Sequence, residues 1–287
     1  MNEMTRIKQK NVYRFLRRFA KNISLDDLEL LPRRYGGSIV FFYGEDRILK
    51  VPKNGHRAAL LKETKLSEYL NTQQLPVTFP TPLWVHDKGF YAVFSRIDGR
   101  EFTAEALERF TPNEMESFTR SLGAFLSFLH DHKFPDDVMQ HIPHATDDLL
   151  AQLKSAKRKI KFIKEHSTEV DTMRWEEKLE SLQDSLDQVW VVTHCDFSLN
   201  HVFSVQGSVK RLAVIDFADA HLHDPSVDFS ELAIDLSEEG LVPDNILEMI
   251  LKHYQTSDRT IAKKIEFGRL TFEIRRAYQQ VRNSRKS

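Results

Sequence analysis

The stretch of residues 190–229 constrains this chain most, because acidic residues there follow short apolar runs. Residues 190–193 are apolar and largely β-branched, which predicts a buried strand that leads to Asp196. A polar loop follows, and residues 201–205 again have the pattern of a strand. A turn that contains glycine and a further apolar run lead to Asp216. The pattern predicts a strand, a loop that carries Asp196, and a hairpin that ends at Asp216.

Carboxylates at these positions suit the transfer of a phosphoryl group. That reaction needs one carboxylate to orient the attacking hydroxyl and others to hold Mg²⁺ on the phosphates of a nucleotide. In the protein-kinase pattern, His-x-Asp is followed five residues later by a metal ligand and then by Asp-Phe-Gly. His194 and Asp196 begin this pattern here, and His201 takes the position of the metal ligand. Asp216 begins the last part, where Ala218 replaces the usual glycine.

The residues alone leave alternatives open. Mg²⁺ prefers oxygen ligands, which favours Asn200, whereas spacing favours His201. Asp196 and Asp216 could be ordinary turn residues, although two motifs in this order around a predicted hairpin seldom arise by chance. A zinc hydrolase could use the same histidines and aspartates, but none of these pairs has the His-Glu-x-x-His spacing of such enzymes.

Three motifs resemble those of the aminoglycoside phosphotransferase family. They are HCDFSLNH at residues 194–201, VIDFADA at residues 214–220 and DPSVD at residues 224–228. Within that family the chain is most similar to the 2''-phosphotransferase branch, whose loop also has Asp-Phe-Ser and places a histidine five residues after the catalytic aspartate. The resemblance covers most of the chain, and it is strong over residues 194–228 and diffuse in the first half.

The resemblance assigns roles to individual residues of these motifs. It implies that Asp196 is the catalytic residue and that Asp216 is a metal ligand. It also implies that His201, rather than Asn200, is the second metal ligand. Family members usually have glycine where Cys195 stands. The replacement of glycine by cysteine makes the loop stiffer here but removes no catalytic group.

The first third of the chain carries the predicted nucleotide site. Residues 30–53 predict three strands, of which the first ends at residues 33–35. Residues 36–38, Gly-Gly-Ser, could bring backbone N–H groups over phosphates or form a plain hairpin turn. The Gly-x-Gly-x-x-Gly loop of protein kinases is absent from the sequence.

A lysine and a glutamate complete this predicted nucleotide site. A nucleotide kinase needs a strand lysine on the α and β phosphates and a helix carboxylate that orients it. Lys50 stands near the end of the third predicted strand, and Glu63 lies in the helix predicted over residues 57–70. Glu68 is the alternative partner. The competing interpretation of Lys50 is a solvated residue at the edge of a strand.

The segment after this site is expected to contact the base of the nucleotide. Residues 90–94 predict a strand, and the polar turn at residues 95–99 interrupts it. By resemblance, this turn is a hinge between two lobes. The resemblance also implies that the backbone at Ser95 and Ile97 pairs with the purine of ATP or GTP.

The whole chain is predicted to adopt an α+β, two-lobed fold like that of protein kinases. The expected parts are a small, β-rich nucleotide-binding lobe at residues 1–94, the hinge at residues 95–99, and a larger helical lobe at residues 100–287. The larger lobe is expected to hold the catalytic and substrate-binding groups. Thr111 begins a capping box of a long helix, and residues 148–186 predict further helices.

Residues 214–250 contain ten acidic residues and no lysine or arginine. Such one-sided charge attracts cations. Four of the acids follow Asp224-Pro225 at i, i+3, i+7 and i+10, which places them along one side of a predicted helix. These four candidates for binding a cationic substrate are Asp228, Glu231, Asp235 and Glu238. If this side faces solvent instead, it is ordinary surface.

Composition limits the remaining classes. With 287 residues, 41% hydrophobic and 29% charged, the chain has the composition of a globular protein with room for two lobes. The net charge of −1 and the lack of an aromatic-interleaved basic groove predict no nucleic-acid partner, although residues 7–21 predict a basic helix. No apolar run approaches the ~18 residues that span a bilayer, and the start shows no apolar signal core. The lone Cys195 cannot form an internal disulfide, which is typical of the cytoplasm.

These expectations combine into a small-molecule kinase with Mg²⁺ as its cofactor. It would move the γ-phosphate of ATP or GTP to a hydroxyl of a cationic aminosugar, and by resemblance this reaction confers antibiotic resistance. A macrolide or metabolite kinase of the same family would share the chemistry and differ in the acceptor. A nucleotide-binding pseudokinase would keep the fold without turnover, but Lys50, Asp196 and Asp216 are all present. The oligomeric state is left open.

Overall fold

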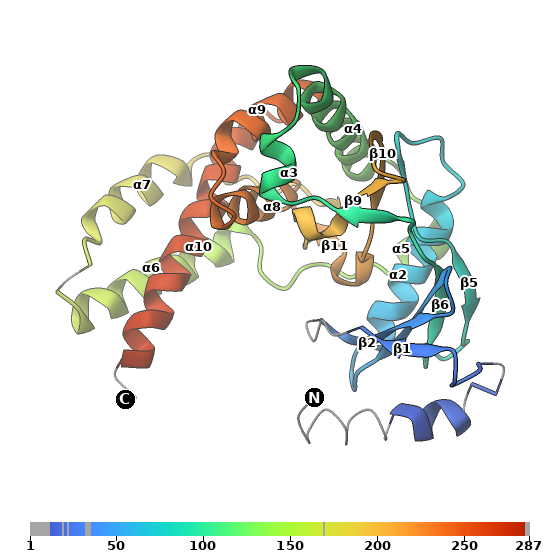
Figure 1. The fold of residues 1–287 in the computed structure, drawn as a ribbon. Coiled ribbons are helices and arrows are strands. Elements are labelled where there is room, and N and C mark those ends of the chain that lie inside the picture. Colours follow the sequence, from blue (N-terminus) through green and yellow to red (C-terminus); the bar gives the residue numbers. More distant parts are fainter. Residues whose placement is uncertain (1–11, 19, 22, 32–35, 169, 285–287) are drawn as a thin grey trace. The chain divides into compact units, whose positions relative to one another are not determined.

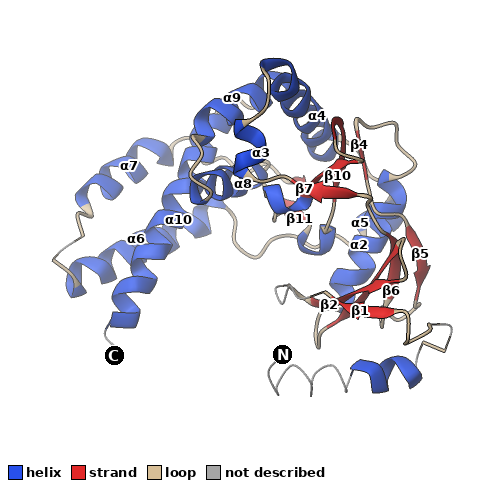
Figure 2. Ribbon diagram, in the orientation of Figure 1, coloured by secondary structure: helices blue, strands red, loops and turns tan. Residues whose placement is uncertain are grey.

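The computed structural model describes residues 12–18, 20–21, 23–31, 36–168 and 170–284, and the chain divides into two compact units. The first unit comprises Met1–Arg100, Phe134–His141 and Val202–Asp219, and the second comprises Glu101–Lys133, Ile142–His201 and Ala220–Ser287. Most strands belong to the first unit and most helices to the second. Figure 2 draws the strands in red and the helices in blue. This distribution confirms the predicted α+β class. The lobe limits that we predicted at residues 94 and 100 stay a prediction.

Within the described part of the first unit, five strands form an antiparallel sheet in the order β1-β2-β3-β6-β5. Their bounds are Leu28–Leu30 for β1, Ser38–Tyr43 for β2, Arg47–Pro52 for β3, Ala92–Ser95 for β6 and Pro82–Val85 for β5. The predicted strands on either side of Gly44 are confirmed. The predicted end of the first strand, at residues 33–35, lies outside the described residues.

Alternating side chains cover the two faces of this sheet, because successive residues of a strand point to opposite sides. One face packs in a core with the helix over residues 12–18, and its strand residues are Phe41, Tyr43, Leu49, Val51 and Val93. On the other face, Ala92 and Phe94 contact Leu60 of α2 (Arg57–Leu70), which has the bounds that the sequence predicts. Figure 1 shows α2 beside this sheet. Lys50 lies between Leu49 and Val51 of β3, which face the core with the helix over residues 12–18. Lys50 therefore points to the opposite face of the sheet, on the side of α2.

A further sheet of the first unit carries the predicted hairpin. The strands β4 (Val77–Thr78), β10 (Ser208–Val214), β9 (Val202–Val205) and β7 (Gly99–Glu101) lie in this order. Gln206 and Gly207, which join β9 to β10, have φ of 52° and 70°. Positive φ at both central residues matches the right-handed twist of a hairpin, and glycine adopts it without strain. The predicted hairpin is confirmed.

Helices make up most of the second unit. They are α3 (Ala104–Glu108), α4 (Pro112–Asp131), α6 (Leu149–His166), α7 (Met173–Gln183), α8 (Ser226–Glu238), α9 (Pro243–His253) and α10 (Ile261–Ser284). The predicted capping box at the start of α4 is confirmed, because the Thr111 hydroxyl accepts from the Glu114 N–H and the Glu114 carboxylate accepts from the Thr111 N–H. None of the described helices is both long and apolar enough to cross a membrane.

Helices α8 and α10 approach each other closely in this unit. A Cβ atom on Gly268 of α10 would lie 2.2 Å from the Ser230 hydroxyl of α8, so a residue larger than glycine would force the two helices apart. The same hydroxyl donates hydrogen bonds to the carbonyls of Ser226 and Ile265, at 2.7 Å and 3.2 Å. The start of α8 is therefore fixed against the first turns of α10.

Candidate active site

Lys50, Glu63 and Asp216 come together in the first unit. The Lys50 Nζ lies 2.6 Å from Glu63 Oε1 and 3.0 Å from Asp216 Oδ1. These residues come from β3, from α2 and from the end of β10, so sheet and helix packing bring them together. Burial opposes the charge of Lys50, but the two carboxylates outweigh it and raise the pKa of Lys50 above its ordinary value. The ammonium therefore stays charged.

Glu63 and Glu68, the two candidate partners of Lys50, lie in different surroundings. The Glu63 side chain is only 4% exposed and lies on the face of α2 that packs inward. Glu68 is exposed and accepts from Lys65 Nζ at 2.8 Å. The geometry therefore pairs Lys50 with Glu63, and the alternative partner Glu68 forms a surface ion pair instead.

Asp216 occupies a backbone conformation that is uncommon for a residue other than glycine, with φ of 68°. The residue that follows it, Phe217, is fully buried and packs against Phe79 at a ring distance of 5.8 Å. This anchor holds the turn, while the Asp216 side chain remains 39% exposed with one oxygen on Lys50. Such non-glycine positions cost of order 1–3 kcal/mol and cluster at functional sites.

The donor set of these residues fits Mg²⁺. Nowhere in the described part of the chain do three or more His, Cys, Asp or Glu side chains form a cluster that could hold a metal alone. Mg²⁺ seldom uses such a cage, because it binds through one or two carboxylates together with water and substrate phosphates. The partly exposed carboxylate of Asp216 beside a cationic Lys50 is compatible with that mode.

Asp196 lies on the loop that follows β8 (Val191–Thr193) in the second unit. Its side chain is 48% exposed, whereas the next residue, Phe197, is fully buried and packs 6.0 Å from the ring of Phe125. Cys195 has φ of 61°, in the left-handed region that glycine adopts without strain. This conformation accounts for the glycine that is usual at this position in the family that the motif resembles.

Asp228 of α8 holds the backbone of this loop. Its carboxylate accepts hydrogen bonds from the N–H groups of His194, at 2.9 Å, and Cys195, at 2.8 Å, and it lies 3.0 Å from His130 Nε2. Burial opposes ionisation, yet these hydrogen bonds keep the pKa of Asp228 below its ordinary value. We predicted that Asp228 binds substrate, and this was wrong. Asp228 is fully buried and positions the loop that carries Asp196.

His130 is a residue of this site that the sequence did not indicate as functional. It is buried near the end of α4, and its other ring nitrogen, Nδ1, lies 2.9 Å from the hydroxyl of Tyr254. Tyr254, His130 and Asp228 thus form a buried polar chain that ends at the loop. The position of His130 on the apolar side of α4, four residues after Leu126, was the available signal.

The ring of His201 is oriented by the same loop. Its Nδ1 lies 2.7 Å from the carbonyl oxygen of Asp196, and a carbonyl can only accept, so Nδ1 donates. In the neutral form of the ring, Nε2 is then the nitrogen that carries the lone pair. A metal-binding histidine commonly donates its other N–H to a carbonyl in this way. Asn200, the alternative ligand, is exposed on the same short 3-10 helix, Leu199–His201.

The remaining acids of α8 divide into two groups. Asp235 Oδ2 accepts from the N–H of Leu199 at 2.8 Å. Both Glu231 and Asp235 lie close enough to Asp196 that its negative charge contributes to raising their pKa. Burial is the main cause that raises the pKa of Glu231 and of Asp235, and the neighbouring acids add to it. Glu238 is 54% exposed and lies 3.5 Å from Arg276. The predicted stripe therefore contributes two acids, not four, beside Asp196.

Solved structures share this architecture. The complex of APH(2'')-IIIa with GDP and kanamycin is 15% identical over 92% of this chain and 90% of that chain, with a TM-score of 0.71. Aminoglycoside phosphotransferase APH(2'')-Ib with bound ADP is 22% identical over 93% and 90%, with a TM-score of 0.67. Macrolide 2'-phosphotransferase MphH from Brachybacterium faecium is 15% identical over 94% and 93%, with a TM-score of 0.65. These similarities confirm the predicted kinase-like fold.

The sequence also matches a family as a whole. A search of curated proteins finds no match. The model of the phosphotransferase enzyme family, in contrast, matches residues 28–263. This range includes Lys50, Glu63, Asp196 and Asp216, the residues on which the kinase interpretation depends. Because the match spans most of the chain, the protein belongs to the phosphotransferase enzyme family.

Proposed function

We propose that this phosphotransferase moves the γ-phosphate of ATP or GTP to a hydroxyl of an aminoglycoside-like, cationic aminosugar. The observation that carries the proposal is the setting of Asp196. Its partly exposed carboxylate lies on a loop whose backbone N–H groups donate to the buried Asp228. Two further acids, Glu231 and Asp235, lie beside it. A hydroxyl flanked by ammonium groups is the acceptor that this arrangement suits.

The nucleotide is assigned to residues of the first unit. Lys50, held in its charged form by Glu63, would contact the phosphates. The Ser95 N–H already donates to the Thr81 carbonyl at 2.8 Å, so Ser95 would offer its carbonyl to a purine and Ile97 its N–H. These roles of Ser95 and Ile97 rest on the family resemblance.

The metal is assigned to Asp216 and His201. Mg²⁺ would supply positive charge that neutralises the phosphate oxygens as the bond to the leaving group breaks. Asp216 is suited to hold it by its partly exposed carboxylate, and His201 by the orientation of its ring. The His201 Nδ1–H donates to the Asp196 carbonyl, so Nε2 is the nitrogen that would bind a metal. This orientation favours His201 over Asn200 in this role.

Asp196 is assigned as the residue that orients the acceptor hydroxyl and accepts its proton. A positioned carboxylate of this kind typically contributes ~10²–10⁴-fold to the rate. Glu231 and Asp235 would bind ammonium groups of the same molecule. An ammonium ion would favour their ionised forms, because an opposite charge nearby lowers the pKa of a carboxyl group.

A macrolide kinase is the second candidate, because the fold similarity to macrolide 2'-phosphotransferase MphH covers 94% of this chain. The deciding experiment is phosphate transfer with ATP and GTP across a panel of aminoglycosides and macrolides, with the Asp196→Asn variant as the blank. We expect turnover with aminoglycosides and, on expression in a susceptible bacterium, resistance to them. Turnover with macrolides alone would replace the acceptor in our proposal, and nucleotide binding without any turnover would indicate a pseudokinase.

A further inference from the structure

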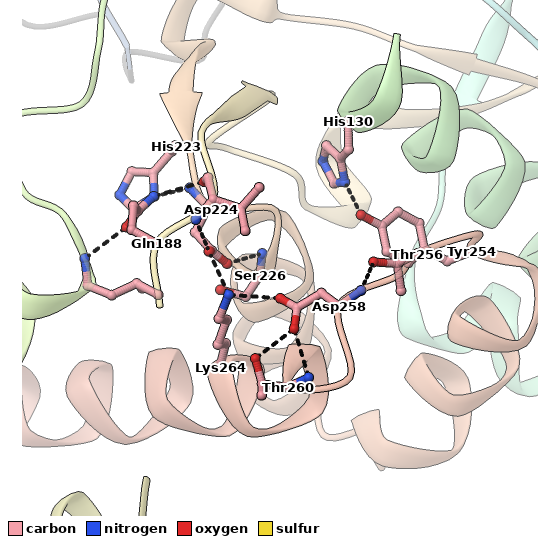
Figure 3. Close-up of polar contacts among 12 residues, drawn as sticks. His130, Gln188, His223, Asp224, Ser226, Tyr254, Thr256, Asp258, Thr260 and Lys264 are labelled. Atoms are coloured by element: carbon pink, nitrogen blue, oxygen red, sulfur yellow. Dashed lines mark hydrogen bonds and ion pairs between the residues drawn. The ribbon is translucent and has the colours of Figure 1, made fainter. Parts of the chain in front are cut away.

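Lys264, in the first turn of α10, is a buried cation outside the residues assigned above. Its side chain is 1% exposed, and its Nζ lies 3.1 Å from Asp224 Oδ2 and 2.8 Å from Asp258 Oδ2 (Figure 3). Burial opposes the charge, but the two carboxylates raise the pKa of Lys264. A buried charge is tolerated only when it is paired and hydrogen-bonded, and Lys264 meets both conditions.

Asp224 connects Lys264 to two backbone segments. Its Oδ2 accepts from the Val189 N–H at 3.0 Å, and its Oδ1 accepts from the Ser226 N–H at 3.1 Å. Helix α8 begins at Ser226, and Asp224 is fully buried two residues before it. The single carboxylate thus binds the chain ahead of β8 and the start of α8.

Both of these segments lead to the loop of Asp196. The chain runs from Val189 through β8 directly into His194 and Cys195. Two residues after Ser226, Asp228 accepts hydrogen bonds from the backbone N–H groups of His194 and Cys195. The loop is therefore held from its own strand and from α8, and Asp224 fixes the start of both.

Asp258 completes the cluster from the loop before α10. Its Oδ1 accepts from the Thr260 N–H at 2.7 Å and from the Thr260 hydroxyl at 2.6 Å. Burial opposes its ionisation, but the hydrogen bonds from Lys264 and Thr260 keep the pKa of Asp258 below its ordinary value. Asp258 therefore fixes the ammonium of Lys264 in place, so that the pair with Asp224 has a single geometry.

We propose that Lys264 is a positioning residue for phosphoryl transfer, which acts through Asp224 on the two segments that hold Asp196. The proposal rests on the assignment of Asp196 as the catalytic carboxylate. A buried ion pair is weak evidence for stability, because apolar residues often replace such a pair without loss. Its link to the Asp196 loop gives this pair a function in placement, and a displacement of about 1 Å can cost ~10²-fold in rate.

The test separates placement from folding. In Lys264→Met we expect kcat to fall roughly 10- to 100-fold, measured well below the unfolding temperature. The affinity for nucleotide in the absence of Mg²⁺, measured by calorimetry, should not change, because Lys50 and Glu63 belong to the other unit. The matched control is Lys263→Met, which removes the same charge at the neighbouring, exposed position and should leave kcat unchanged. A lower melting temperature with an unchanged kcat for Lys264→Met would overturn the proposal.

A second variant covers the case in which Lys264→Met does not fold. The double variant Lys264→Met with Asp224→Asn removes the fully buried charge that the single change leaves uncompensated, and the remaining carboxylate of Asp258 is 16% exposed, so the double variant should recover part of the stability. Its single amide oxygen at position 224 cannot accept from Val189 and Ser226 in the geometry of two carboxylate oxygens, so kcat should stay low. Full recovery of kcat in the double variant would overturn the placement role. Turnover that survives Asp196→Asn would instead reject the catalytic assignment on which the proposal rests.

Discussion

Two aspartates of the second unit have the same side chain and opposite surroundings. Asp196 is 48% exposed at the tip of a loop, whereas Asp228 is fully buried under it and accepts from two backbone N–H groups. The sequence identifies Asp196 by its spacing to His194 and Asp216. It does not reveal that Asp228 is buried, because helical spacing places it beside Glu231 and Asp235 but does not say where the apolar face ends.

Replacing Asp196 by asparagine should abolish turnover and leave the protein folded. The change removes the group that accepts the proton, and such a group is typically worth ~10²–10⁴-fold. Nucleotide affinity should persist, since Lys50 and Asp216 are intact. Steady-state phosphate transfer and calorimetry check the two parts. Activity above about 1% of the unmodified enzyme would remove Asp196 from this role.

Replacing Asp228 by asparagine should destabilise the fold as well as reduce activity. Asparagine has one acceptor oxygen where the carboxylate has two, and a buried donor that is left without its acceptor typically costs roughly 1–3 kcal/mol. Because the pKa of Asp228 is lowered in the folded state, the stability that it contributes is complete above the pKa of the unfolded chain and is lost as pH falls through the folded value. Urea unfolding at neutral and at acid pH should show that the variant loses this part of the acid dependence. Equal free energies of unfolding at neutral pH would contradict this expectation.

The ligand role of His201 can be tested against that of Asn200. His201→Asn should restore an oxygen donor at the same position and retain substantial activity, because Mg²⁺ prefers oxygen. His201→Ala should need much more Mg²⁺ for half-maximal rate, and Asn200→Ala should not. Titration of the rate with Mg²⁺ gives both values. The reverse order of the two alanine variants would assign the metal to Asn200.

Helix α8 combines two tasks along its length. Its first turns hold the Asp196 loop through Asp228, and its later turns present Glu231 and Asp235 beside Asp196. The sequence predicted this helix and its acidic stripe. The division of labour depends on tertiary packing, because α10 approaches α8 closely where Gly268 meets Ser230.

Glu231→Gln and Asp235→Asn should each raise the KM for a cationic acceptor by about 10-fold, since a hydrogen bond to a charged group contributes roughly 1.5–3 kcal/mol. Because burial raises the pKa of both carboxyl groups, they take up protons at higher pH than ordinary carboxyls. The KM should therefore rise as pH falls toward these raised values, and the variants should lose that dependence. Glu238→Gln, at the exposed position paired with Arg276, is the matched control. Equal KM values in all three variants would place the acceptor elsewhere.

At the level of local elements, the sequence predicted most where the signals are local. The bounds of α2, the capping box at Thr111 and the β9–β10 hairpin follow from periodicity, capping and turn residues. Lys264 gave no signal, because its partners Asp224 and Asp258 are 40 and 6 residues away in the chain. Buried ion pairs are formed by tertiary packing and have no sequence pattern of their own.

For the molecule as a whole, the fold is retained where the sequence has diverged widely. Solved structures with 15–22% identity superpose over more than nine-tenths of this chain. The residues that our sequence interpretation singled out lie in short motifs, but the motifs are distant along the chain. Lys50 and Asp216, for example, are 166 positions apart. Packing of β3, α2 and β10 within one unit brings them to 3.0 Å.

Nucleotide binding should therefore be visible as a change in the stability of the protein. A ligand that binds only the folded state at 100 times its Kd stabilises by about 2.7 kcal/mol. We expect Mg²⁺-nucleotide to raise the melting temperature and a chelator to remove most of that increase. Asp216→Ala should lose the Mg²⁺-dependent part, because a metal held by few protein ligands cannot spare a carboxylate. An increase that is the same with and without Mg²⁺ in both proteins would reject Asp216 as a ligand.

Cys195 has a left-handed backbone and can serve as a reporter of the loop that carries Asp196. Glycine at this position would relieve strain of order 1–3 kcal/mol in the folded chain but cost conformational entropy of roughly 0.5–1 kcal/mol, so the two effects partly offset each other. Cysteine can thus stand where relatives usually have glycine. Cys195 is the single cysteine of the chain and directly precedes Asp196. A thiol-reactive fluorophore would therefore label this loop alone, and its signal would follow acceptor binding without any engineered substitution.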